Sequence, residues 1–84
     1  MSPGWDYAAN RAAVNFIRRC KPSEARRLLA VLERLVDNPA MRTDGSFRDE
    51  SGRKISIVQL SGYRIHFWVD HFAKEVRVLD IGRG

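Results

Sequence analysis

The sequence predicts an α+β fold in which an N-terminal helical hairpin packs on one face of a small antiparallel β-sheet. Two observations predict it. Apolar residues recur at helical spacing in the first half of the chain, and three runs with strand character follow in the second half. We expect residues 1–84 to form a single domain of this kind.

Two helices are expected, at residues 8–20 and 23–37. Pro22 separates them, because proline suits the first turn of a helix and not its interior. Asp37-Asn38-Pro39 ends the second helix, since the residue before proline avoids the α region. The first helix would bury Ala9, Ala13, Phe16 and Ile17, and the second would bury Ala25, Leu28, Leu29, Leu32, Leu35 and Val36.

Three strands are expected, at residues 54–60, 63–70 and 75–81. Ser61-Gly62 reads as a two-residue hairpin loop, where Gly supplies the positive φ of a primed turn. Residues 40–52 are rich in turn formers and predict a connection with a short edge strand. Residues 1–7 show no clear strand, so the sheet either lacks one edge or holds only a stub there.

The hairpin loops fix the register, which places Gln59 opposite Arg64, Ile57 opposite His66, and Trp68 opposite Arg77. His66 should then face Leu79. The face packed on the helices would carry Val58, Leu60, Ile65, Phe67, Val69, Val76 and Val78. The open face would carry Arg53, Gln59, Arg64, His66, Trp68, Asp70 and Arg77 among Ile55, Ile57, Leu79 and Ile81. This basic, aromatic open face is the main candidate site.

Composition narrows the class of protein. The 84 residues are 44% hydrophobic and 30% charged, which is typical of a folded domain. The sequence shows no secretory signal and no apolar run of membrane-spanning length, so a cytoplasmic protein without a membrane partner is expected. The single Cys20 forms no intramolecular disulfide, and with two His it makes a metal site improbable, so no cofactor is expected.

The formal net charge is +5, and most of the cationic residues are arginine. Arginine presents a planar fork that suits phosphate and carboxylate, which favours nucleic acid or an acidic protein as partner. A solvated basic surface explains the same charge, so charge alone does not decide between them.

The order of several short motifs resembles the RelE/ParE toxin superfamily. Ser61-Gly62-Tyr63-Arg64-Ile65 matches the "SGYR" turn of that family, and Ile81-Gly82-Arg83 matches the glycine and basic residue near the end of its last strand. Residues 70–76 are similar to a "DHxxKEV" hairpin found in a subgroup. The resemblance covers roughly residues 8–83.

The resemblance implies a toxin of a type II toxin–antitoxin system, neutralised by a cognate acidic antitoxin. RelE-like members cut mRNA in the ribosomal A site, and ParE-like members inhibit DNA gyrase. We expect this chain to need no metal, because its sequence offers no ligand cluster and cationic side chains can serve instead. In the nuclease branch, lysines and arginines on the open face activate the ribose 2′-hydroxyl and stabilise the phosphate. We therefore expect a ribosome-dependent mRNA endonuclease, with a non-catalytic gyrase inhibitor or a degenerate toxin fold that binds protein as the alternative.

Carried onto this chain, the family pattern assigns Arg64 to the scissile phosphate. Its two strand lysines fall on Ile55 and Ile57, and the segment that supplies its C-terminal tyrosine has no counterpart. His66 is the substitute expected for proton transfer, because histidine changes charge near neutral pH. The expected catalytic set is Arg64, His66 and Arg83, and the expected RNA- and phosphate-binding set is Arg53, Trp68, Arg77 and Lys54.

Each of these residues has a structural reading that the sequence leaves open. Arg64 is equally suited to a cross-strand contact with Gln59 or Asp80, and Trp68 with Arg77 to a structural cation–π pair. The resemblance also leaves open whether the chain forms a homodimer or only a toxin–antitoxin hetero-oligomer. A stand-alone RNA-binding module is a third hypothesis, motivated by charge and Trp68.

Overall fold

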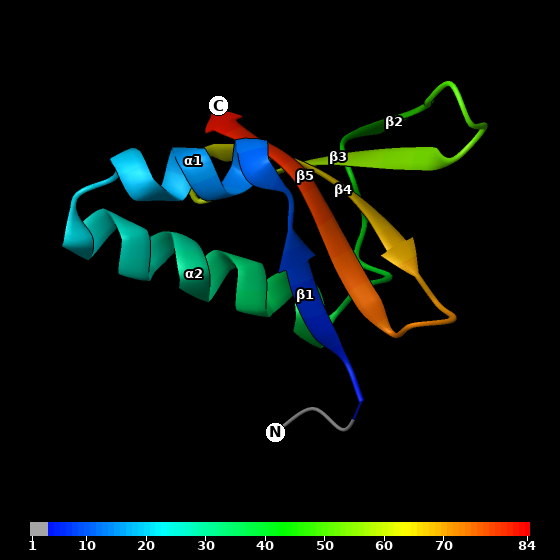
Figure 1. Cartoon of the computed structure of the whole chain (residues 1–84), viewed down its shortest axis with the longest axis horizontal. Helices are drawn as coiled ribbons and strands as arrows, with labels where there is room; N and C mark the ends of the chain where they lie inside the picture. The colour runs from blue at the N-terminus through cyan, green and yellow to red at the C-terminus, as the bar shows by residue number, and fades with distance from the viewer. Residues whose placement is uncertain (1–3) are drawn as a thin grey trace.

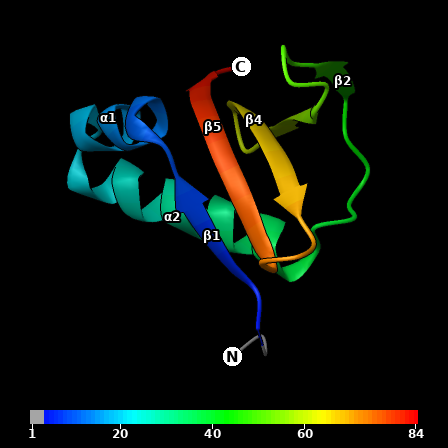
Figure 2. The same cartoon turned by 45° about the vertical axis from the view of Figure 1, so that its right-hand side comes forward.

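A computed structural model describes residues 4–84 as two helices packed on one face of a five-stranded sheet (Figure 1). The elements in chain order are β1 (Asp6–Ala9), α1 (Arg11–Arg19), α2 (Pro22–Asp37), β2 (Gly45–Arg48), β3 (Lys54–Leu60), β4 (Tyr63–Asp70) and β5 (Glu75–Arg83). The strands are arranged in the order β1-β5-β4-β3-β2. Figure 2 shows α2 passing behind β1 and β5, which leaves the opposite side of these strands uncovered. The predicted fold class is confirmed.

The sheet has a first strand that the sequence pattern did not reveal. β1 pairs with β5 in parallel, with Tyr7 opposite Val76 and Ala9 opposite Val78, and it forms the edge of the sheet. The strand is only four residues long, too short for alternation to show. Because Ala8 and Ala9 belong to β1, α1 begins at Arg11, three residues later than residue 8, where the sequence placed it.

Local chemistry sets the ends of both helices. Asn10 is the N-cap of α1, and its side-chain oxygen accepts a hydrogen bond from the backbone N–H of Ala13 at 3.2 Å. Pro22 occupies the first turn of α2, as expected from its fixed φ. α2 ends at Asp37, which agrees with the stop predicted before Pro39.

The predicted register of β3 and β4 is confirmed from Leu60–Tyr63 through Ile57–His66. The loop residues Ser61 and Gly62 both have positive φ, of 52° and 86°, as a type I′ turn requires. The expected pairs Asp70–Glu75 and Trp68–Arg77 are also present between β4 and β5.

The register of β4 against β5 changes at a β-bulge, which makes one prediction wrong. Phe67 pairs with Val78, but the next residue of β4, His66, pairs with Asp80 instead of Leu79. Leu79 is therefore the extra residue of the bulge, and the side chains beyond it exchange faces. Ile81, expected on the open face, is 3% exposed and lies in the core, while Asp80 is exposed beside His66.

The core lies between the helices and the sheet. It contains Ala13, Leu28, Val31, Leu32, Leu35 and Val36 from the helices and Val58, Tyr63, Ile65, Phe67, Val76, Val78 and Ile81 from the sheet. Val31 is buried, whereas Leu29, expected in the core, is 37% exposed. Within residues 4–84, no helix has the length and apolar character needed to cross a membrane.

Candidate functional site

Arg64 and His66 project from β4 on the open face, the side of the sheet opposite the helices. Their neighbours Tyr63, Ile65 and Phe67 are buried in the core, and alternation along the strand turns Arg64 and His66 the other way. Arg64 is exposed, and within residues 4–84 its side chain has no ion pair or hydrogen bond. Its guanidinium is therefore available to an anion from outside.

His66 is half-buried between two groups that sequence reasoning did not assign to the site. The ring of Phe47, on β2, lies 5.8 Å from the imidazole in an edge-to-face arrangement. Asp80 is the cross-strand partner of His66 because of the bulge. A signal for the bulge exists in the sequence, since strict alternation from Val78 would place the charged Asp80 in the core. We call Phe47, Arg64, His66 and Asp80 the Arg64 patch.

Ile55 and Ile57 lie on the open face, as the register predicted. Phe47 pairs with Ile55, His66 pairs with Ile57, and the Phe47 and His66 rings touch, so all four share one side of the sheet. Ile55 is 1% exposed although it lies outside the main core cluster. Two apolar side chains therefore occupy the positions at which the family resemblance places two lysines.

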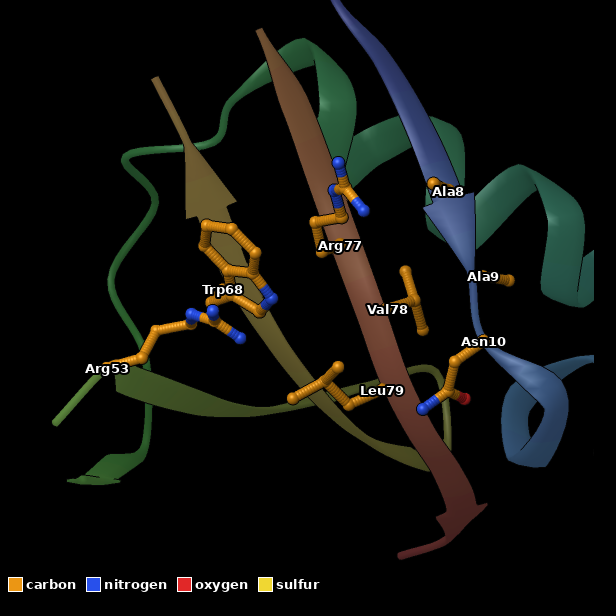
Figure 3. A pocket seen from close by; sticks show the side chains of 8 residues that line it. All are labelled: Ala8, Ala9, Asn10, Arg53, Trp68, Arg77, Val78 and Leu79. Carbon is orange, nitrogen blue, oxygen red and sulfur yellow. The ribbon is translucent and has the colours of Figure 1, made fainter. Parts of the chain in front are cut away.

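A second group of side chains lies farther along the open face. The guanidinium carbon of Arg53 lies 4.2 Å from the centroid of the Trp68 ring, and that of Arg77 lies 5.7 Å from it, both within cation–π range. Figure 3 shows Trp68 between these two arginines. Together with Ala8, Ala9, Asn10, Val78 and Leu79, they line a pocket of about 450 Å³, which we call the Trp68 pocket.

Carboxylates hold both arginines in place. Arg77 forms ion pairs with Glu75 at 3.1 Å and with Asp70 at 3.7 Å. Arg53 follows a turn organised by Asp49, whose Oδ1 accepts hydrogen bonds from the backbone N–H groups of Ser51 and Arg53 at 2.9 Å. The hydrogen bonds from Ser51 and from the Arg53 backbone lower the pKa of Asp49, so this carboxylate stays ionised.

Arg83 and Lys54 do not join the open face. Arg83 lies on the helix side, where both of its terminal nitrogens bind the carboxylate of Glu24 on α2 and its guanidinium carbon is 5.4 Å from the Phe16 ring centroid. The sequence grouped Arg83 with Arg64, but they project from opposite sides. Lys54 lies by the loop after α2, in a second pocket that includes Met41 and shares Arg53 and Trp68 with the Trp68 pocket.

Glu24 links α2 to the end of the sheet. Besides Arg83, it accepts a hydrogen bond of 2.7 Å from the hydroxyl of Tyr63. The hydrogen bonds from Arg83 and Tyr63 lower the pKa of Glu24 from 4.5 to about 2. The same contact raises the pKa of Tyr63.

This pKa shift predicts how stability depends on pH. The ionised form of Glu24 stabilises the fold above its unfolded pKa of 4.5, and this contribution disappears as the pH falls from there to about 2. Glu24→Gln should therefore be less stable than the wild type at neutral pH, and the difference should vanish towards pH 2. Urea unfolding across this pH range measures it. Glu33→Gln on the exposed side of α2 is the matched control, and an equal loss in both variants would contradict the assigned role.

Within residues 4–84 there is no group of three or more His, Cys, Asp and Glu side chains placed to hold a metal ion. The open face carries guanidinium, imidazole, carboxylate and aromatic side chains. The domain is thus a small α+β fold with exposed guanidinium and aromatic side chains on the uncovered face of its sheet.

Solved structures show which known proteins share this fold. The chain superposes on a chain of the intact E. coli RelBE toxin–antitoxin complex with a TM-score of 0.69 and 19% sequence identity. The superposition covers 95% of this chain and 96% of that chain. For the isolated E. coli RelE toxin the TM-score is 0.69 at 18% identity, over 95% and 84% of the two chains. For a chain of the archaeal RelE–RelB complex from Pyrococcus horikoshii OT3, the TM-score is 0.70 and the sequence identity is 16%. This superposition covers 95% of our chain and 94% of the archaeal one.

No protein-family model matches the chain, and no curated protein sequence matches it significantly. The chain therefore has the fold of the RelE toxins at low sequence identity. The resemblance that the "SGYR" turn and the final Gly-Arg indicated is confirmed at the level of the fold.

Proposed function

We propose that this protein is the toxin of a type II toxin–antitoxin pair and acts in the cytoplasm as a ribosome-dependent mRNA endonuclease. The observation that carries the proposal is the Arg64 patch, where an exposed arginine with no ion pair or hydrogen bond to residues 4–84 lies beside a histidine on the open face of a RelE-like fold. The other arginines assigned from the sequence are held by carboxylates.

The chemistry needed is transfer of a phosphoryl group within the RNA strand. The ribose 2′-oxygen attacks the adjacent phosphorus, the bond from phosphorus to the 5′-oxygen breaks, and a cyclic phosphate forms. His66 would accept the 2′-hydroxyl proton, and water would protonate the leaving 5′-oxygen. Arg64 would stabilise the charge that grows on the phosphoryl oxygens.

The proposed partner is an acidic antitoxin. Two of the structures that share the fold are complexes of a toxin with its antitoxin, RelB. The formal net charge of +5 supports an acidic protein as the neutralising partner of this chain.

The His66→Ala variant tests the proton-transfer role. Because general base catalysis contributes about 10²–10⁴-fold, the variant should cut ribosome-bound mRNA at least about a hundredfold more slowly than the wild type. Added imidazole should restore part of the rate, since it replaces the missing base. His66→Gln should stay slow with or without imidazole, because the amide fills the space without accepting a proton. Full activity of either variant would exclude His66 as the base.

One observation favours the alternative, a non-catalytic inhibitor of gyrase or a degenerate toxin fold that binds protein. Ile55 and Ile57 stand where the family resemblance places its lysines, and the neighbouring Phe47 is 46% exposed, so the open face presents apolar surface suited to a protein partner. In that case, growth arrest would persist in the His66→Ala variant, mRNA would stay intact, and supercoiling by gyrase would fall.

A further inference from the structure

The polar groups that line the Trp68 pocket are almost all hydrogen-bond donors. The indole N–H of Trp68 and the guanidinium groups of Arg53 and Arg77 can only donate. The side-chain oxygen of Asn10 is already used to cap α1, which leaves its NH₂ group as the free end. Figure 3 shows the amide nitrogen of Asn10 and the indole nitrogen of Trp68 both directed towards β5.

No acidic residue lines this pocket. Asp70 and Glu75 bind Arg77 but are not part of the lining, so they fix its guanidinium and reduce its charge without blocking the space. The Nε–H of Arg77 is shielded from solvent and has no acceptor within residues 4–84. A pocket with this lining selects a ligand that is rich in acceptors and negatively charged.

The pocket also has an apolar, flat side. Leu79, the extra residue of the bulge, adds apolar surface on one side of Arg77, and Ala8 of β1 adds it on the other. The volume of about 450 Å³ lies in the range of pockets that hold a small molecule. A ligand with a flat ring, carbonyl acceptors and an attached phosphate matches both the apolar surface and the donor groups of the pocket. An acidic side chain has acceptors but no ring to pack on the apolar surface.

We propose that the Trp68 pocket binds one nucleotide, whose base packs on Leu79 and accepts a hydrogen bond from the Trp68 indole N–H, and whose phosphate binds Arg53 and Arg77. This proposal rests on the proposed function for its source of ligand. Trp68 and Arg64 lie on the same side of β4, four residues and about 13 Å apart. The Trp68 pocket would therefore bind a nucleotide that flanks the cleaved bond, and the Arg64 patch would bind the scissile phosphate.

The indole N–H resonance of Trp68 in an NMR spectrum is the most direct probe. Trp5→Phe leaves Trp68 as the remaining tryptophan, so its signal is unambiguous. The probes are uridine monophosphate, a short 2′-O-methyl oligoribonucleotide that cannot be cleaved, inorganic phosphate, and an acidic peptide. We expect a saturable shift with both nucleotide probes, at concentrations at least about tenfold below any shift caused by phosphate. Tighter binding of the oligonucleotide identifies an RNA strand as the ligand, and tighter binding of the monophosphate identifies a free nucleotide.

Asn10→Asp separates binding from folding. Aspartate caps a helix as well as asparagine does, but it removes the donor and adds a negative charge to the pocket. We expect nucleotide binding to weaken at least about tenfold with unchanged thermal stability. Asn15→Asp on the exposed side of α1 is the matched control and should bind as the wild type does.

The outcomes separate this proposal from the endonuclease proposal. Arg64→Ala should lose cleavage and retain the Trp68 shift with uridine monophosphate, because Arg64 is not part of the pocket. No saturable shift, an equal response to inorganic phosphate, or a response to the acidic peptide alone would overturn the nucleotide site. A normal shift in a protein that never cuts mRNA would keep the site and refute only the nuclease.

Discussion

Replacing Arg64 with alanine should reduce ribosome-dependent mRNA cleavage about 10²–10³-fold and abolish growth arrest. Loss of a single group that stabilises charge in a transition state has this size of effect. The fold should be unaffected, because Arg64 is exposed and makes no contact that holds β4 in place within the described chain. Primer extension on a translated mRNA measures the rate, and circular dichroism checks the fold.

The control is Arg26→Ala, which removes the same charge from an exposed position on α2. It should cleave as fast as the wild type, which separates a local role of Arg64 from the effect of net charge. The cleavage rate of Arg64→Lys should lie between those of Arg64→Ala and the wild type, because lysine keeps the charge but lacks the planar fork. Equal cleavage by Arg64→Ala and the wild type would contradict the placement of the phosphate on Arg64.

Replacing Phe67 with alanine should lower the free energy of unfolding by about 3–5 kcal/mol. Phe67 is 1% exposed, lies in the core beneath the helices, and occupies the position of β4 where the bulge begins. A domain of this length has a total stability of roughly 4–13 kcal/mol, so the variant should lose between about a quarter and all of it. Urea denaturation at neutral pH measures the loss.

Phe72→Ala is a matched control for this prediction. Phe72 lies in the turn between β4 and β5 and is fully exposed, so the same truncation there removes no buried contact. Its effect should stay within about 0.5 kcal/mol of the wild type. A similar loss in both variants, or a loss under about 1 kcal/mol for Phe67→Ala, would contradict the assigned core.

The fold was largely predictable because its long elements repeat a clear pattern. α2 shows its apolar stripe over several turns, and the loop Ser61-Gly62 sets the register of β3 on β4. β1 was not predictable in this way, since its four residues pair with β5, some 70 positions away in the chain, and short edge strands carry little alternation. Its pairing depends on tertiary contacts.

The candidate site was predictable in part, and one inserted residue explains much of the difference. Arg64, His66, Trp68 and Arg77 follow from alternation along β4 and β5 up to the bulge. Beyond Leu79 the faces exchange, which brings Asp80 to His66 and sends Ile81 to the core. The same exchange turns Arg83 to the helix side, where the carboxylate of Glu24 on α2 binds it.

We propose above all that this chain cuts mRNA on the ribosome with Arg64 on the scissile phosphate and with His66 in the proton-transfer role that lysines have in the RelE-like toxins. The most direct test is an in vitro translation reaction with the purified protein, in which primer extension maps cuts in the mRNA with and without ribosomes. Our account predicts cuts that require ribosomes and that stop when the cognate antitoxin is added. Intact mRNA and continued translation in the presence of folded protein would contradict it and favour a binding role for the open face.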